Sequence, residues 1–379
     1  MPAKAIVVGG GVFGFTAAIE LSLRGHDVTV YDPGPIPHPL AESTDISKVV
    51  RLDYGADTDY VALGETALAG WRRWNDECHE AGHAPLFHET GVTFLSRATM
   101  QPGGFEHDSY QTLVGRGHPL ERLDADAIAR RFPAYRPGVY VDGYFNPVGG
   151  WAEASATVRF LAERAQFMGV ELREARVDDL ETLEADLVVV CAGAWVPRLL
   201  PALAGSLRAV GQPVFHLAPD DPSLFEASRF PVFGADLAQT GYYGFPATKG
   251  IVKIANHGTG IPIARDEDRV TTAGQERALR DFVREAFPAL ADAPIVHTRL
   301  CVYCDTLDSH FWIAPHPARS NIIVATGGSG HAFKFGPALG AVIADIALGI
   351  AHPLADKFRW RTELAVRARG DAARHDDFP

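Results

Sequence analysis

The sequence predicts an α/β protein, α+β overall, in which a Rossmann-like domain is interleaved with a smaller domain built on an antiparallel or mixed sheet. Two observations support this fold class. The chain has 379 residues, more than one ordinary hydrophobic core accommodates, which favours two domains. Strand and glycine-turn segments occur at the start, in the middle and near the end of the chain, separated by segments of another type. One sheet should therefore collect strands from distant parts of the sequence.

The N-terminal segment carries the clearest motif. "KAIVVGGGVFGFTAAIELSLRGHDVTVYD" predicts a strand over residues 5–8, a glycine turn, a helix and a second strand that ends at Asp32. Gly9, Gly11 and Gly14 fit G-x-G-x-x-G, and Asp32 lies 21 residues beyond Gly11. Such glycines let the backbone approach a pyrophosphate at a helix N-terminus. An acidic residue at this place accepts ribose hydroxyls, which favours NAD or FAD over NADP.

The later elements follow from periodicity and from turn residues. The expected strands are "LFHETGVTFLS", "EADLVVVCAGAW", "YYGFPA", "GIVKIANH" and the start of "NIIVATGGSGHAFKFGPALGAVIADIALG". The expected helices are "DADAIARRFPAY", "WAEASATVRFLAERAQFMGVEL", "AGQERALRDFVREAF" and the end of that last segment. The tail "RARGDAARHDDFP" is polar and is expected to be frayed.

Composition excludes several classes of partner. A net charge of −12 argues against nucleic acid and against an anionic membrane, because both recruit basic patches. Nothing resembles a signal peptide, and the longest apolar stretch, "ALGAVIADIALGIA", is interrupted by Asp345. Four cysteines in a chain of this length make no disulfide framework. A reduced, cytoplasmic protein is expected.

Cys301 and Cys304 form a C-x-x-C pair, whose spacing can indicate zinc or redox chemistry. A zinc site needs four ligands, and the other two cysteines, Cys78 and Cys191, lie far away without a C-x-x-C partner. A redox pair needs a helix after its first cysteine, whereas turn and strand follow here. In an extended segment Cys301 and Tyr303 would share one face and Cys304 would take the other. The spacing is therefore interpreted as coincidental, and no metal is expected.

The segment "GIVKIANH" carries a cation and an imidazole in a strand pattern. Lys253 and His257 share one face of the expected strand, while Val252 and Ile254 take the other. A functional site and a solvated strand face explain this spacing about equally well.

Several longer segments together resemble one family. "CVYCDTLDSHFWIAPHP", "VATGGSGHAFKF", "SKVVRLDYG", "YYGFPATKGIVKIANH" and the glycine fingerprint are similar to the monomeric sarcosine oxidases and their relatives, the N-methyltryptophan, pipecolate and fructosyl-amino-acid oxidases. The resemblance covers nearly the whole chain. It implies a monomer with an FAD-binding domain from residues 1–85, 147–205 and 300–365, a substrate-binding domain from 86–146 and 206–299, and a polar tail from 366–379.

The resemblance also implies how FAD is held. Cys301 would carry the flavin through an 8α-thioether, and the turn from Gly328 to His331 would pass the pyrimidine edge of the flavin. The helix that begins near Pro337 would stabilise negative charge there with its positive end. The full set of implied cofactor contacts is Gly9, Gly11, Val12, Phe13, Gly14, Asp32, Cys301, Gly328, Gly330, His331 and Lys334.

The substrate residues are implied in the same way. Arg51 and Lys334 would hold a substrate carboxylate, since a guanidinium and an ammonium both suit that anion. Tyr243 and Tyr303 would line the substrate pocket. Two further roles are implied, oxygen activation by Lys253 and contact with the bound amine by His257.

Two departures leave the substrate group open. Lys48 stands in "SKVVR" where the sarcosine group usually has arginine. A lysine at this position resembles the fructosyl-amino-acid oxidases instead. Those enzymes generally carry an acidic residue at the position of His257. Lys48 is also the second candidate for oxygen activation.

The expected activity is an FAD-dependent oxidation of a secondary amine, an N-alkyl and typically N-methyl α-amino acid, which yields an imine and hydrogen peroxide. The expected partners are a small-molecule amine and oxygen. The alternatives are a fructosyl-amino-acid oxidase, a cyclic imino-acid oxidase, a flavin dehydrogenase with another electron acceptor, and a nicotinamide-dependent dehydrogenase.

Overall fold

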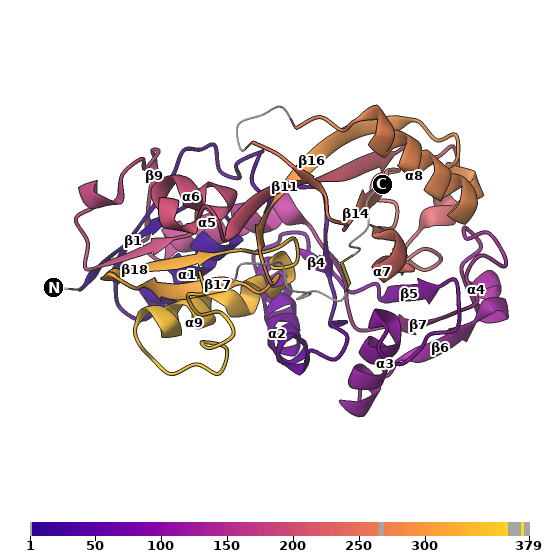
Figure 1. Ribbon diagram of the computed structural model, residues 1–379, viewed down its shortest axis with the longest axis horizontal. Coiled ribbons are helices and arrows are strands. Elements are labelled where there is room, and N and C mark those ends of the chain that lie inside the picture. Colours follow the sequence, from indigo (N-terminus) through magenta and orange to yellow (C-terminus); the bar gives the residue numbers. More distant parts are fainter. Residues whose placement is uncertain (1, 265–268, 363–372, 375–379) are drawn as a thin grey trace.

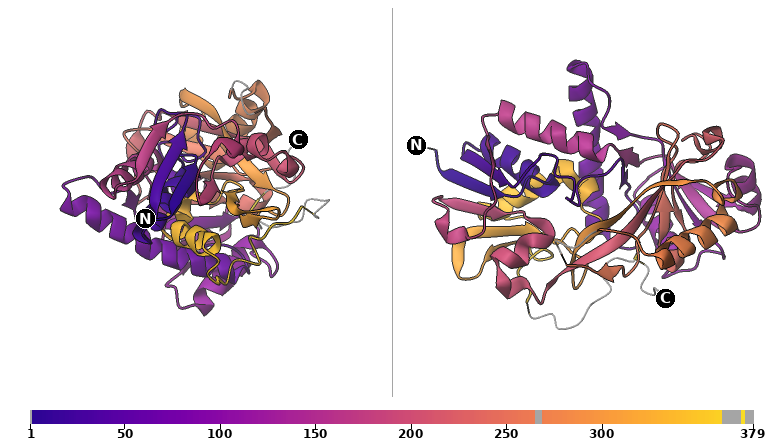
Figure 2. Two further views of the ribbon diagram at one scale, coloured as in Figure 1. Left: turned by 90° about the vertical axis from the view of Figure 1, so that its left-hand side faces the viewer. Right: turned by 90° about the horizontal axis from the view of Figure 1, so that it is seen from above.

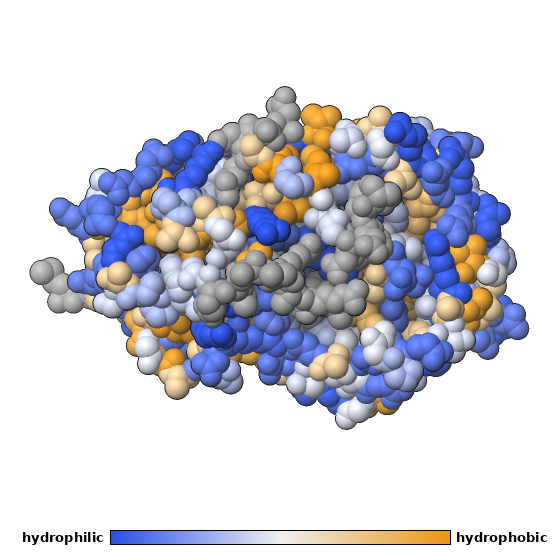
Figure 3. All heavy atoms as spheres, in the orientation of Figure 1, coloured by the Kyte–Doolittle hydropathy of each residue, from blue (hydrophilic) through white to orange (hydrophobic). Residues whose placement is uncertain are grey.

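A computed structural model describes residues 2–264, 269–362, 373 and 374. The molecule is elongated, and its two halves lie side by side along the long axis (Figures 1 and 2). The described strands form a six-stranded, a nine-stranded and a three-stranded sheet. No helix in this part of the chain is long and apolar enough to cross a membrane. On the face seen in Figure 3, hydrophilic side chains predominate and hydrophobic ones lie between them in small groups.

The six-stranded sheet forms the core of the first half. Neighbouring strands are parallel, except that β17 runs antiparallel to β18. In spatial order the strands are β17 (Trp312–His316), β18 (Arg319–Thr326), β10 (Leu187–Val190), β1 (Lys4–Val8), β2 (Asp27–Asp32) and β9 (Glu171–Glu174). The central strands are apolar throughout and buried on both faces, as in a sheet covered by helices.

Helices cover one face of this sheet. α1 packs against α5 and α9, and α9 also packs against the long helix α2. Their bounds are α1 (Val12–Leu23), α2 (Thr58–Glu80), α5 (Ala154–Phe167) and α9 (Gly336–Ala347). α2 begins where the Asp57 side chain accepts a hydrogen bond from the backbone N–H of Tyr60. The other face carries α6 (Val196–Leu199) and part of β16 (Ile295–Thr306).

The nine-stranded sheet forms the second half. It is mixed, because β5 and β12 are parallel and the other pairs are antiparallel. In spatial order its strands are β15 (Ile261–Pro262), β11 (Leu207–Leu217), β14 (Val252–Asn256), β13 (Tyr242–Gly244), β12 (Val232–Ala235), β5 (Val92–Ser96), β7 (Asp142–Asn146) and β6 (Glu121–Asp124), with β16 also paired to β11. The helices of this half are α3 (Phe105–Gly115), α4 (Ala125–Arg131), α7 (Leu237–Thr240) and α8 (Ala273–Ala286).

One expected strand is divided. "LFHETGVTFLS" forms β4 (Phe87–His88) and β5, which belong to different sheets. β4 joins the three-stranded sheet with β8 (Gly150–Ala152) and β3 (Lys48–Val50). The chain turns between the two strands at Gly91, whose φ of 78° is accessible to glycine with little strain. The single-strand expectation is therefore wrong.

The expected frayed tail lies outside the described residues, except for Ala373 and Arg374. Both are buried, and the Arg374 guanidinium pairs with Asp305 at 2.5 Å. For these two residues the expectation of fraying is wrong, because a packed methyl group and a buried ion pair fix them.

β16 connects the two halves. It pairs with β11 along nearly its whole length, and both strands run from one half to the other (Figure 1). The domain boundary expected at residue 300 therefore falls inside this strand. Cys301 and Tyr303 pack on one face, while Cys304 packs with the core of the first half on the other. The predicted alternation of these side chains is confirmed.

Candidate active site

A cavity of about 480 Å³ lies at the carboxyl ends of four parallel strands. The backbone of Gly9 to Gly11 borders it after β1, and Asp32 borders it at the end of β2. Cys191 to Gly193 follow β10, and Gly328 follows β18. Parallel sheets bind ligands in such crevices.

The glycine turn fits a dinucleotide. A Cβ on Gly14 would lie 1.8 Å from the carbonyl oxygen of Gly9, and a Cβ on Gly9 would lie 2.5 Å from the carbonyl oxygen of Cys191. Larger residues would therefore push the helix away from the strands. Gly11 caps α1 without a side-chain hydrogen bond, and the first turn of α1 carries no acidic residue. The positive end of the helix is thus available to a phosphate, and the adjacent residues Val12 and Phe13 line the same cavity.

Asp32 is held in place by the backbone. Its Oδ2 accepts a hydrogen bond from the N–H of Gly10 at 2.7 Å, and its Oδ1 accepts one from the N–H of Gly34 at 2.9 Å. Each carboxylate oxygen has a second lone pair, so the group can still accept hydroxyl groups in the cavity. Together the glycines and Asp32 fit the adenosine diphosphate part of FAD.

The buried Cys301 has a cationic neighbour. The Nζ of Lys48 lies 3.7 Å from its Sγ. Burial opposes the charge of Lys48, but the thiolate form of Cys301 and the carboxylate of Asp45 outweigh burial and raise the pKa of the lysine. Cys304 is different, since burial raises its thiol pKa to about 12. Reactive cysteines lie beside cationic groups. Cys301 has such a neighbour, whereas the Sγ of Cys304, which borders the large cavity, lies 3.4 Å from the hydroxyl of Thr326.

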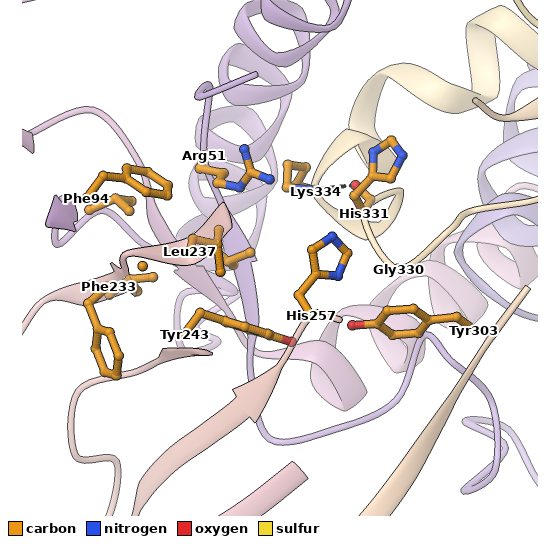
Figure 4. A pocket seen from close by; sticks show the side chains of 14 residues that line it. Arg51, Phe94, Phe233, Leu237, Tyr243, His257, Tyr303, Gly330, His331 and Lys334 are labelled. Atoms are coloured by element: carbon orange, nitrogen blue, oxygen red, sulfur yellow. Dashed lines mark hydrogen bonds between the residues drawn. The ribbon is translucent and has the colours of Figure 1, made fainter. Parts of the chain in front are cut away.

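A second, smaller cavity of about 40 Å³ lies among the residues predicted to bind the substrate. Figure 4 shows Arg51 and Lys334 on one side, with His257 across from them. The hydroxyl groups of Tyr243 and Tyr303 point toward each other below His257. The apolar side chains Val49, Val92, Phe94, Val232, Phe233 and Leu237 line the rest.

Arg51 is a buried cation without a full set of acceptors. The residue is 5% exposed, and among the described residues its Nη1 has no hydrogen-bond partner. The guanidinium lies 4.7 Å from the ring centre of Tyr54. A buried N–H group without an acceptor is costly, so this nitrogen is suited to an anion that enters the cavity.

Lys334 is the second cation of the cavity. Its Nζ donates to the hydroxyl of Tyr54 at 2.9 Å and to the carbonyl oxygen of His331 at 2.6 Å. The His331 ring is held between the hydroxyl of Tyr54 at 3.1 Å and the carbonyl oxygen of Ser309 at 2.9 Å. The turn before it needs glycine, because a Cβ on Gly330 would lie 2.0 Å from the Tyr303 ring. This turn thus connects the two cavities.

The tyrosines of the small cavity stay protonated. Burial raises the pKa of Tyr243 to about 12, despite the nearby charge of Lys48. Burial also raises the pKa of Tyr303 well above its usual value, and the two hydroxyl groups are hydrogen-bonded to each other. The His257 ring lies 5.9 Å from that of Tyr303. At neutral pH the phenols therefore act as hydrogen-bond donors and not as bases.

The structure separates Lys253 from His257 although they share a strand face. His257 lines the small cavity, whereas the Nζ of Lys253 donates to Asp45 Oδ2 at 2.7 Å and to the carbonyl oxygen of Ser47 at 2.6 Å. Burial lowers the pKa of Lys253 to about 8, although Asp45 opposes that shift. Lys48 and Cys301 also act on this lysine electrostatically. Lys48, Cys301, Asp45 and Lys253 therefore form one cluster, in which Lys48 is half-buried and the other three are buried.

Sequence reasoning missed two acidic members of this region. Asp45 carried no signal in "AESTDISK", because its partner Lys253 is 208 residues away. Glu42 borders the large cavity, and burial raises the pKa of its carboxyl to about 7. This half-buried acid beside a glycine-lined cavity is visible only once the loop between β2 and β3 is placed.

Comparison with known proteins identifies the family. The sequence profile of the FAD-dependent oxidoreductases (DAO) matches residues 4–346, most of the chain. The chain belongs to this family. It is therefore an FAD-dependent enzyme, as expected, and its α/β fold class is confirmed by solved structures of similar fold.

Two similar proteins are oxidases by name. The chain is 28% identical over 365 residues to monomeric sarcosine oxidase of Bacillus sp. (strain B-0618), with 90% of this chain and 91% of that protein covered. It is 30% identical over 363 residues to N-methyl-L-tryptophan oxidase of Salmonella newport (strain SL254), with 91% and 94% covered.

Two solved structures show the same fold. Fructosamine oxidase from Aspergillus fumigatus (Amadoriase II) in complex with FSA has a TM-score of 0.81 at 23% identity, over 99% of this chain and 94% of that one. Fructosyl peptide oxidase from E. terrenum has a TM-score of 0.81 at 24% identity, over 99% and 96%.

Proposed function

We propose that the protein is an FAD-dependent oxidase of a secondary amine, an N-alkylated α-amino acid, and that it releases hydrogen peroxide. The observation that carries this proposal is the buried guanidinium of Arg51, whose Nη1 has no acceptor among the described residues. Lys334 adds a second cation to the same cavity. Such a pair suits the carboxylate of an amino acid, and the amine of that substrate would then lie near His257 and the two phenols.

The rest of the cavity favours an apolar N-substituent or side chain. Apart from His257 and the two phenols, the side chains that line the cavity beside the cations are Phe94, Phe233, Leu237, valines and His331. A sugar hydroxyl buried against such carbon surfaces would lose its hydrogen bonds to water without replacement. This argument favours an N-alkyl amino acid over a fructosyl amino acid, although structures of the fructosyl enzymes share the fold.

The chemistry requires positioning more than a strong base. FAD, when bound, accepts the hydrogen of the substrate carbon together with its electron pair. Arg51 and Lys334 fix the carboxylate, and a protonated phenol can donate a hydrogen bond to the neutral amine. Overall the C–H and N–H bonds of the amine break to give an imine, and oxygen takes up two electrons and two protons to give hydrogen peroxide. Water then hydrolyses the imine.

An amine panel assayed for hydrogen peroxide tests the proposal. We expect turnover of N-methyl amino acids with apolar side chains. Fructosyl-valine should be slower in kcat/KM by about 10- to 100-fold, the cost of roughly 1–3 kcal/mol for an unpaired buried polar group. Sarcosine, pipecolate and proline complete the panel. Faster turnover of fructosyl-valine would contradict the substrate class, and substrate-dependent bleaching without peroxide would indicate another electron acceptor.

We also propose that Cys301 binds the flavin covalently, because the ammonium of Lys48 lies 3.7 Å from its Sγ and reactive cysteines have cationic neighbours. Acid-precipitated protein is therefore expected to stay yellow. Cys301→Ser should release its flavin on denaturation, and Cys304→Ser should not. The measurement is the absorbance of supernatant and pellet after precipitation. Retention of the flavin in both variants would rule out this linkage.

A further inference from the structure

Three basic side chains form a line across neighbouring strands of the large sheet. His216 on β11 is paired directly with Lys253 on β14 and with His297 on β16. Residues paired in this way project from the same face, with their Cβ atoms about 5 Å apart. The line runs from the interior to the surface. The side chains of Lys253 and His216 are 2% and 9% exposed, whereas His297 is exposed.

Asp45 joins the two inner members of this line. Its Oδ2 accepts the hydrogen bond from Lys253 at 2.7 Å, and its Oδ1 lies 3.5 Å from the Nε2 of His216. The rings of His216 and His297 lie 5.0 Å apart between their centres. The step from Lys253 to Asp45 is thus a hydrogen bond, and the step from Asp45 to His216 is a slightly longer contact. The step from His216 to His297 is a gap that one water molecule can bridge.

The other charged groups around the line are Lys48 on β3 and Arg299 on β16. Arg299 donates to the carbonyl oxygen of Thr44, next to Asp45. Burial alone would raise the pKa of Asp45, but Lys253, His216, Lys48 and Arg299 hold it well below its usual value. Asp45 therefore stays ionised. Its two oxygens align the ammonium of Lys253 on one side and the imidazole of His216 on the other, so a proton can pass between these two bases without resting on the carboxylate.

We infer that His297, His216 and Asp45 carry protons from the solvent to Lys253. This inference rests on the proposed oxidase function. Hydrogen peroxide forms when oxygen gains two electrons and two protons, and Lys253 can give one of these protons from its ammonium group. The neutral amine that remains is buried at 2% exposure. A proton that comes from the solvent can reach it through protein groups, and two imidazoles in line are suited to this because each ring has two nitrogens, one to take up a proton and one to release it.

A purely structural role for Asp45 would not explain this arrangement. Neutralising Lys253 needs one carboxylate, and Asp45 supplies it. His216 helps to keep Asp45 ionised, but this does not require His297, which extends the line of paired residues to the surface. Because His216 and His297 act through Lys253 and touch no reacting atom, they are positioning residues for proton transfer.

Variants of the two histidines test the inference. His216→Asn should slow the recovery of yellow colour on aeration about 100-fold, the lower range of positioned proton transfer. His297→Ala should slow it roughly tenfold, because water can replace part of a surface group. Added imidazole should restore the rate of His297→Ala. His83→Ala, which removes another exposed histidine, is the control. The inference would be overturned if His216→Asn and His297→Ala both reoxidised at the parent rate, or if imidazole did not rescue His297→Ala.

A second measurement needs no turnover. Partial burial and the neighbouring His216 lower the pKa of His297, and the carboxylate of Asp45 opposes this lowering. By NMR titration of ¹⁵N-labelled histidine in the substrate-free protein, His216→Asn should raise the pKa of His297, and Asp45→Asn should lower it. An unchanged titration in both variants would show that the groups are not connected, and would overturn the inference.

The same variants separate this inference from the proposed function. If Lys253→Met slows reoxidation and the histidine variants do not, the proton route is wrong and the oxidase proposal stands. If no amine yields peroxide with the parent protein, the proposed function itself fails. In that case the NMR titration still tests whether His297 is coupled to His216 and Asp45.

Discussion

Lys253→Met is expected to slow reoxidation of the reduced protein by air about 100-fold or more, the effect of removing one preorganised charge. Reduction by the amine without air should remain largely intact. Oxygen becomes an anion when it accepts its first electron, and a fixed ammonium in a buried site stabilises that anion without reorganisation. Lys253 is 2% exposed and held by Asp45. Stopped-flow absorbance of the two half-reactions is the measurement.

Two further variants make this result specific. Lys249→Met removes an exposed lysine that lies four residues earlier in the sequence, and it should leave both half-reactions unchanged. Lys253→Arg should recover part of the rate because it keeps the charge. If the Met variant reoxidises at the parent rate and fails in anaerobic reduction, Lys253 serves substrate binding. Lys48 would then be the next candidate for oxygen activation.

The pH dependence of reoxidation follows from the same group. Burial lowers the pKa of Lys253 to about 8, so its ammonium form predominates below pH 8 and is lost above it. Reoxidation should therefore slow as the pH rises through about 8. In the unfolded chain this lysine keeps its proton up to about pH 10.5. The unfolded state thus binds more protons between these two values, and the contribution of this group to stability rises with pH in that window.

Arg51→Ala should weaken the binding of a carboxylate substrate by roughly 2–4 kcal/mol, which is about 30- to 1,000-fold. The substrate carboxylate would be buried beside Lys334 alone and would lose its bidentate partner. KM in steady-state assays and Kd for anionic inhibitors are the measurements. The affinity of Arg51→Lys for the substrate should lie between those of the parent protein and Arg51→Ala, since an ammonium keeps the charge but not the bidentate geometry of the guanidinium.

The controls for Arg51 concern both protein and substrate. Arg72→Ala removes an exposed arginine that pairs with Glu89 and should leave KM unchanged. An amide or ester of the same amino acid should bind weakly to the parent protein and be insensitive to Arg51→Ala. Equal turnover of the uncharged amine and its carboxylated analogue would remove the basis for this assignment.

Local patterns predicted the parts of the site that lie within one element. The glycine turn followed from a strand, a helix and their spacing, and the opposite faces of Cys301 and Cys304 followed from strand alternation. Lys253 and His257 were placed on one face for the same reason. Strand periodicity does not reveal, however, that one of these side chains enters a cavity while the other pairs with a carboxylate.

Contacts between distant segments could not be predicted in this way. Asp45 meets Lys253 because the loop before β3 packs over the large sheet, and no local pattern specifies that packing. The row of Lys253, His216 and His297 depends on the registers of β11 with two partners, which side-chain packing sets. The division between β4 and β5 depends on Gly91, where the chain leaves one sheet for another.

The continuity of β16 has a consequence for recombination between relatives. Cys301 and Tyr303 are two residues apart on one strand, so the backbone itself fixes their Cα atoms about 7 Å apart. The spacing between the proposed flavin anchor and the substrate pocket is therefore insensitive to small rotations of one half of the molecule against the other. Chimaeras that exchange β12 and α7, which line the apolar side of the pocket, should keep this spacing. A crossover inside β16 would also have to preserve the register of this strand with β11.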